Sequence, residues 1–302
     1  MFKSIRVYKL ASDWKHPSGP ALEAALKKFA FRPLGATEKE SMGWAAPRPV
    51  DHSPMIEVIG GQWLMKLQTE TKSVPGGVLR KALDARCKKI EDETGRKPGR
   101  KEKKELKEEI ELFLLPRAFS KSGATLVWFD PDNQRLIVGS SSQRAADDVM
   151  TKFIEATQEA GDIAPLTLLQ TEVAPSTAIA QWLLDKDAPA GFTVDRELEL
   201  RQPDNEKSAV KYARHNLEIE EVVQHIKSGK VPTQVAMTWN DRVSFVLTAD
   251  LSLKKIELLE DVFSDVDEDD FGFDGDAAIS TGELAKLITD LVDALGGELV
   301  RE

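Results

Sequence analysis

The stretch 76–115 restricts the fold of this chain most, because its apolar residues recur at helical spacing in two separate blocks. The first block comprises Leu79, Leu83, Cys87 and Ile90, and the second comprises Leu106, Ile110, Phe113 and Leu114. Turn-forming residues stand before the first block at Pro75-Gly76-Gly77, and the segment 94–99 separates the two blocks. The pattern predicts a helical hairpin whose two apolar stripes pack against each other.

The same stretch concentrates positive charge in an acidic protein. Residues 80–107 hold 12 Lys and Arg against 6 Asp and Glu, whereas the whole chain has a net charge of −10. A mixed-charge helix pair is most often a solvated surface. A local excess of +6 also suits binding to a polyanion, so a solvated surface and a polyanion-binding surface both stay open.

The rest of the chain alternates short strand and helix patterns. Strands are predicted at 2–10, 55–59, 62–70, 117–121, 124–130, 134–139, 164–169, 192–201, 207–214, 233–239 and 242–249. Helices are predicted at 18–29, 142–160, 175–185, 218–228 and 281–295. The hairpin turns between strands indicate an α+β fold of antiparallel sheets with flanking helices and a protruding helical hairpin.

The composition limits the chemistry that the chain can perform. Its single cysteine, Cys87, excludes a disulfide within the chain and a multi-thiolate zinc site, and its place on an apolar stripe suits a small core residue. The first residues lack the apolar core of a signal peptide, and no apolar run is long enough for a membrane span. We expect a cytoplasmic protein.

The acidic segment 265–270 resembles a calcium-binding loop only superficially. A loop that begins at Asp265 needs Gly at its sixth position and Glu at its twelfth, where this chain has Asp270 and Asp276. We therefore expect a solvated acidic loop that also repels a polyanion from its face.

No intact catalytic motif is found. Gly229-Lys230 ends like a phosphate-binding loop, but Val231 replaces the required Ser or Thr. Asp130 and Asp132 form the best carboxylate pair, and the turn at 130–133 explains them without chemistry. We expect no enzyme activity, no catalytic residues, no metal and no cofactor.

The segment Leu114-Leu115-Pro116-Arg117-Ala118-Phe119-Ser120 resembles the RdgC family of bacterial recombination-associated proteins. Further similarities follow in order along the chain: Val7-Tyr8-Lys9-Leu10, Met42-Gly43-Trp44, the basic helical hairpin, the segment 225–231, Thr281-Gly282-Glu283-Leu284 and the acidic stretch before Phe271.

The resemblance implies a non-catalytic protein that binds duplex DNA with little sequence preference. A horseshoe-shaped monomer is expected to form a ring-shaped homodimer that encircles DNA and limits access of the RecA recombinase, in association with the nucleoid. It also implies three parts: 1–74 with 117–162 as a central α+β domain, 75–116 as a basic helical tip, and 163–302 as an α+β base.

Nine basic residues are the DNA-binding candidates: Arg86, Lys89, Arg96, Lys97, Arg100, Lys101, Arg117, Lys211 and Arg214. The resemblance implies that Lys211 and Arg214 face the hole of the ring and that Phe119 closes the dimer. For Arg117, the alternative to a phosphate contact is an ordinary surface ion pair. For Phe119, the alternative to dimer closure is a core position on a strand. The six tryptophans suit base stacking, but burial explains most of them better.

Two other classes of function stay open. One is a DNA-processing or nucleotide-dependent enzyme with a noncontiguous site. The other is an adaptor whose basic hairpin binds an acidic protein. The sequence also leaves open whether single-stranded DNA is bound and whether RecA is contacted directly.

Overall fold

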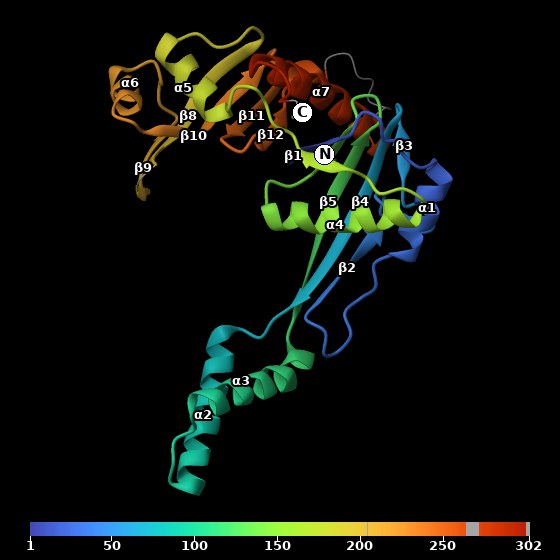
Figure 1. Cartoon of the computed structure of the whole chain (residues 1–302), viewed down its shortest axis with the longest axis vertical. Coiled ribbons are helices and arrows are strands. Elements are labelled where there is room, and N and C mark those ends of the chain that lie inside the picture. Colours follow the sequence, from blue (N-terminus) through green and yellow to red (C-terminus); the bar gives the residue numbers. More distant parts are fainter. Residues whose placement is uncertain (204, 264–271, 300–302) are drawn as a thin grey trace. The chain divides into compact units, whose positions relative to one another are not determined.

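The computed structural model describes residues 1–203, 205–263 and 272–299, and Figure 1 traces their course. Packing divides the chain into two compact units. The larger unit comprises Met1–Ala25, Ala46–Met65 and the chain from Thr125 onward, and the hairpin unit comprises Leu26–Ala45 and Lys66–Ala124. These boundaries follow the packing of the backbone, and the three-part domain division stays a prediction.

The described residues form an α+β fold with seven α-helices and antiparallel strands, as the sequence predicts. The helices are α1 (Gly19–Lys28), α2 (Gly76–Thr94), α3 (Arg100–Leu114), α4 (Gln143–Glu159), α5 (Pro175–Asp185), α6 (Glu220–Lys227) and α7 (Phe273–Ala294). The strands are β1 (Ser4–Leu10), β2 (Glu40–Ala45), β3 (Glu57–Ile59), β4 (Gln62–Lys72), β5 (Ser120–Asp130), β6 (Arg135–Val138), β7 (Leu166–Leu168), β8 (Phe192–Gln202), β9 (Asn205–Ala213), β10 (Val231–Trp239), β11 (Val243–Thr248) and β12 (Leu253–Leu258).

In the larger unit, neighbouring strands follow the order β5-β6-β1-β12-β11-β10-β8-β9, with β3 paired to β4 and β7 paired to β1. The predicted alternation in β10 is confirmed, because Val235, Met237 and Trp239 all lie in the core. Helices α5 and α7 lie against these strands and contribute to the same apolar cluster (Figure 1). On β8, charged side chains alternate with buried leucines and lie on the other face of the sheet.

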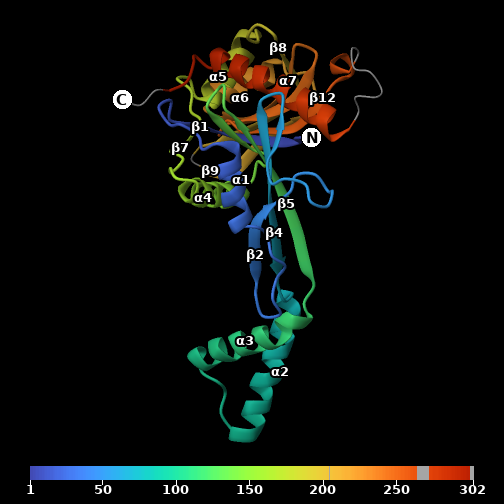
Figure 2. The same ribbon diagram turned by 90° about the vertical axis from the view of Figure 1, so that its right-hand side faces the viewer.

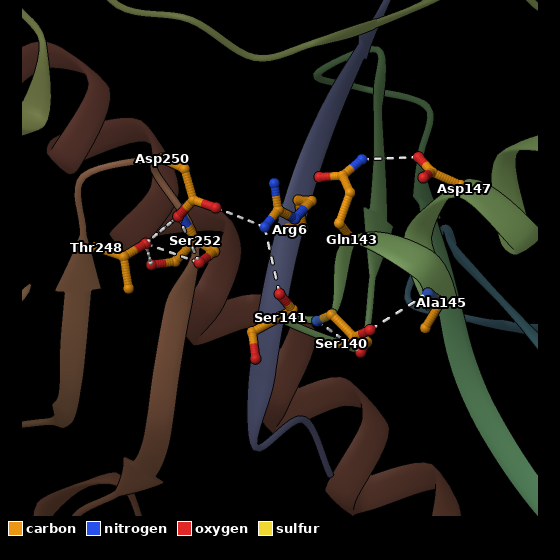
Figure 3. A network of polar contacts seen from close by, with 10 residues as sticks. Arg6, Ser140, Ser141, Gln143, Ala145, Asp147, Thr248, Asp250 and Ser252 are labelled. Carbon is orange, nitrogen blue, oxygen red and sulfur yellow. Dashed lines mark hydrogen bonds and ion pairs between the residues drawn. The ribbon is translucent and has the colours of Figure 1, made fainter. Parts of the chain in front are cut away.

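Strand β1 is tied to the β11–β12 turn by a polar network (Figure 3). The buried Arg6 donates from Nη2 to Asp250 Oδ2 at 2.6 Å and to the Ser141 carbonyl at 3.3 Å. Burial raises the pKa of Asp250, but hydrogen bonds from Thr248, Ser252 and Arg6 outweigh it and lower that pKa to about 2. The network therefore joins strands that are far apart in the sequence.

In the hairpin unit, β2 pairs with the second part of β4. Gly43 of β2 lies so close to another segment that a Cβ at this position would stand 2.5 Å from the Phe31 backbone nitrogen. Only glycine permits this approach. The small residue in Met42-Gly43-Trp44 thus has a packing role.

Four secondary-structure predictions need correction. The strand predicted at 117–121 and the next one form the single strand β5, which a 3-10 turn at Leu115–Arg117 precedes. Strands β2 and β12 were not predicted, and α7 begins before residue 281. In β12, Lys255 has φ +50° and the pairing register shifts, so Leu253 and Ile256 are both buried at a spacing of three, which hides the strand. The acidic segment 265–270 lies outside the described residues.

Candidate nucleic-acid interface

The predicted helical hairpin is confirmed as α2 and α3, which cross at an angle in Figure 2. Helix α2 ends because Gly95 adopts φ +70° and its amide donates to the Glu91 carbonyl. Helix α3 begins after the extended Gly99. Leu79 and Leu106 are buried, as the stripes predict, but Phe113 is 66% exposed. The second stripe was therefore predicted too wide, since Phe113 faces solvent.

All six candidate cations of the hairpin are exposed to solvent. Three of them have acidic partners on the same hairpin: Arg96 binds Glu102 at 2.8 Å, Lys97 lies 3.6 Å from Glu91, and Lys89 lies 3.8 Å from Glu93. The other three, Arg86, Arg100 and Lys101, have no ion-pair partner among the residues that the structure describes. The hairpin thus offers two kinds of cation to a ligand.

Arg117 and Phe119 flank the turn that leads into β5. The Phe119 side chain is 96% exposed, so the alternative of a core aromatic is wrong. The Arg117 guanidinium lies 5.4 Å from the centre of the Phe113 ring, and no ion pair of Arg117 occurs in the described part of the chain. Leu112 is also exposed here. The junction of α3 and β5 therefore combines exposed apolar side chains with an arginine that has no ion pair among the described residues.

Lys211 and Arg214 belong to the larger unit, apart in the packing from the hairpin cations. Lys211 lies on β9 and binds Glu199 of β8 at 2.7 Å. Arg214 follows β9 with φ +56° and lines an open groove of about 550 Å³, where Arg196 and Lys255 lie among carboxylates. The groove therefore has mixed charge. The DNA-binding candidates divide between the hairpin unit and the larger unit.

Glu199, which the sequence did not single out, organises the Lys211 group. Its buried carboxylate also accepts from Arg201 Nε at 2.6 Å and from Thr233 Oγ1 at 3.2 Å. Burial raises the pKa of Glu199, but the hydrogen bonds from Lys211, Arg201 and Thr233 outweigh it, so the pKa lies below its ordinary value. The alternating segment Glu197-Leu198-Glu199-Leu200-Arg201 was the available signal, since it places these charges on one face.

In the described ranges, no three His, Cys, Asp or Glu side chains form a group that could hold a metal ion. Asp130 is buried and accepts a hydrogen bond from Asn133 in its turn, as expected. Five of the tryptophans are buried, and Trp182 is half-buried. No described helix is long and apolar enough to cross a membrane.

The chain matches a family model described as "Putative exonuclease, RdgC" over residues 1–298, and it belongs to the RdgC family. Curated relatives carry the name recombination-associated protein RdgC. The relative from Cupriavidus pinatubonensis is 41% identical, and that from Cupriavidus necator is 42% identical, each with 98% of both chains covered. The relative from Herminiimonas arsenicoxydans is 39% identical over 100% of this chain and 99% of its own. The predicted family is therefore confirmed.

Proposed function

We propose that this protein binds duplex DNA without sequence preference and does no chemistry on it. The observation that carries this proposal is the exposed, unpaired state of Arg86, Arg100 and Lys101, among the described residues, on a hairpin with an excess of positive charge. Such cations can displace the counterions of DNA phosphates, an interaction that reads no bases. The names of the curated relatives support a role in recombination.

The proposal extends to the assembly. A horseshoe-shaped monomer would pair with a second copy through the exposed Phe119 and close a ring around the duplex. The exposure of Leu112, Phe113 and Phe119 around the junction of α3 and β5 supports this, because large exposed apolar side chains favour a protein interface. A ring in the nucleoid would restrain RecA by occupying its DNA, and dissociation would be slow because the DNA is enclosed.

Fluorescence anisotropy tests the binding. Two labelled duplexes of unrelated sequence are titrated with the protein at several salt concentrations. Equal affinities that fall steeply with salt are expected. Strong preference for one sequence contradicts binding without sequence preference. No binding even at low salt contradicts DNA binding altogether and favours an acidic protein partner for the hairpin.

Encirclement has a separate test. The protein is loaded on a closed circular plasmid, and half of the sample is then linearised with a restriction enzyme. After a high-salt wash, a ring stays on the circle and slides off the linear ends. Equal retention on both forms contradicts the ring, while nonspecific binding itself stays supported.

The wording of the family model favours a second candidate, an exonuclease. Purified protein is incubated with magnesium and with linear, nicked and circular DNA. If nucleotide release co-purifies with the protein and mutation of a carboxylate abolishes it, an exonuclease function replaces the non-catalytic proposal. Intact DNA after prolonged incubation is the result expected from the first proposal.

A further inference from the structure

Strand β8 presents a line of charged side chains on the face opposite the core. Glu199 and Arg201 are two residues apart, and the buried Leu198 and Leu200 alternate with them. Lys211 of β9 lies directly across from Glu199 in the antiparallel register. The two cations and the carboxylate are therefore neighbours on one surface of the sheet.

The Glu199 carboxylate is saturated by its neighbours. Oε1 accepts from Arg201 Nε and from Thr233 Oγ1, while Oε2 accepts from Lys211 Nζ. Only 8% of this side chain is exposed. A buried carboxylate with this many donors has little freedom, so it holds both cations in fixed positions.

Among the described residues, Arg201 is held at only one of its three nitrogens. Nε faces Glu199, and neither Nη nitrogen has a hydrogen-bond partner among the described residues. The side chain is 45% exposed, and that of Lys211 is 68% exposed. Two cations around one carboxylate leave a local charge of +1. The free edge of a guanidinium matches two oxygens of a phosphate.

We propose that Arg201 is a phosphate-binding residue of this protein and that Glu199 is the residue that positions Arg201 and Lys211 for binding phosphate. The inference rests on the proposed binding of duplex DNA. It adds Arg201 to the predicted DNA-binding residues, and it assigns a supporting role to a carboxylate whose negative charge would otherwise be considered unfavourable for DNA.

Arg242 provides a contrast within the larger unit. It also binds a buried glutamate, Glu283, but it does so through both Nε and Nη2, at 2.8 and 2.9 Å. Its Nη1 reaches the Asp261 carbonyl at 3.4 Å. Every nitrogen of Arg242 is engaged, so it offers no free edge to a phosphate.

The first test compares Arg201→Gln with the control Arg242→Gln by anisotropy on a labelled duplex. We expect Arg201→Gln to weaken binding about 10-fold at low salt. The slope of log affinity against log salt concentration should fall by about 0.9 for each phosphate that the variant no longer neutralises. Arg242→Gln should keep the wild-type affinity and slope, and circular dichroism and thermal melting verify that both variants fold.

The second test is Glu199→Gln, which preserves the size of the side chain and removes one negative charge. If Glu199 acts only as a nearby charge, the variant binds duplex more tightly than the wild type. Positioning predicts weaker binding instead, because the amide cannot hold both cations. Tighter binding by folded Glu199→Gln overturns the positioning role.

The outcomes separate this inference from the function on which it rests. Wild-type affinity and slope in Arg201→Gln overturn the binding of phosphate by Arg201 but leave duplex binding in place. A wild-type protein that binds no duplex at low salt overturns the proposed function and this inference together.

Discussion

The two kinds of cation on the α2–α3 hairpin lead to a quantitative prediction. One triple variant converts the unpaired Arg86, Arg100 and Lys101 to Gln, which keeps good helix propensity. The matched control converts Lys89, Arg96 and Lys97, which have acidic partners, to Gln. Both variants remove the same charge from the same hairpin, so a difference in total charge cannot explain a difference between their slopes.

The expected magnitude follows from counterion release. If each unpaired cation meets one phosphate, the unpaired variant reduces the slope of log affinity against log salt concentration by about 2.7, at about 0.9 per phosphate. Between 50 and 200 mM salt, the wild-type affinity then falls about 40-fold more than that of the variant. The control should show a smaller reduction, because a phosphate has to compete with Glu91, Glu93 and Glu102 for the paired cations.

Anisotropy on one labelled duplex at four or more salt concentrations measures both slopes. Thermal melting serves as the check on folding. Arg100 and Lys101 lie in the first turn of α3, where cations oppose the helix dipole, so their removal should stabilise the helix by about 0.3 kcal/mol or more. Equal reductions of slope in the two variants would refute the reasoning, since total charge alone would then govern binding.

Three further predictions concern the assembly and the fold. Phe119→Ala should weaken self-association in sedimentation velocity without lowering the melting temperature, because this ring is 96% exposed; unchanged association would contradict the closure role. Gly43→Ala should lower the free energy of unfolding in urea by about 1–3 kcal/mol, because the added Cβ would lie 2.5 Å from the Phe31 backbone nitrogen. An unchanged free energy of unfolding would argue against this packing. The lowered pKa of Asp250, about 2, means that its contribution to stability is present above about pH 4 and is lost as pH falls toward 2. Asp250→Asn should flatten stability against pH in this range, and an unchanged profile would contradict the stabilising role of the Asp250 carboxylate and its hydrogen bonds from Thr248, Ser252 and Arg6.

Much of the fold was predictable because its signals are local. Periodic apolar residues identified both helices of the hairpin, and the strand patterns at 55–59 and 62–70 placed β3 and β4. Strand β12 was not predicted because a bulge at Lys255 breaks the alternation of apolar and polar residues that marks a strand. Strand β2 has no such alternation and contains Gly43, whose role depends on the close approach of the Phe31 backbone.

The candidate interface was likewise predictable from the sequence only in part. Positive charge on the hairpin, and the exposure of its lysines and arginines, follow from the sequence because charged side chains on an amphipathic helix face water. Lys89 and Glu93 are one turn apart on α2, but the partners of Arg96 and Lys97 depend on the course of the loop between α2 and α3. Lys97 therefore meets Glu91, whereas the nearby Arg100 meets no acidic partner among the described residues.

The sequence by itself determined the family, the helical hairpin, the excess of positive charge on it and the alternation that puts Glu199 and Arg201 on one face of β8. Only the tertiary structure decided which hydrogen-bond donors the Glu199 carboxylate would meet. The register of β8 against β9 and β10 brings Lys211 and Thr233 to the Glu199 carboxylate, and the outer edge of Arg201 stays free among the described residues. Cross-strand neighbours are set by pairing between distant segments, and no local pattern of residues carries that information.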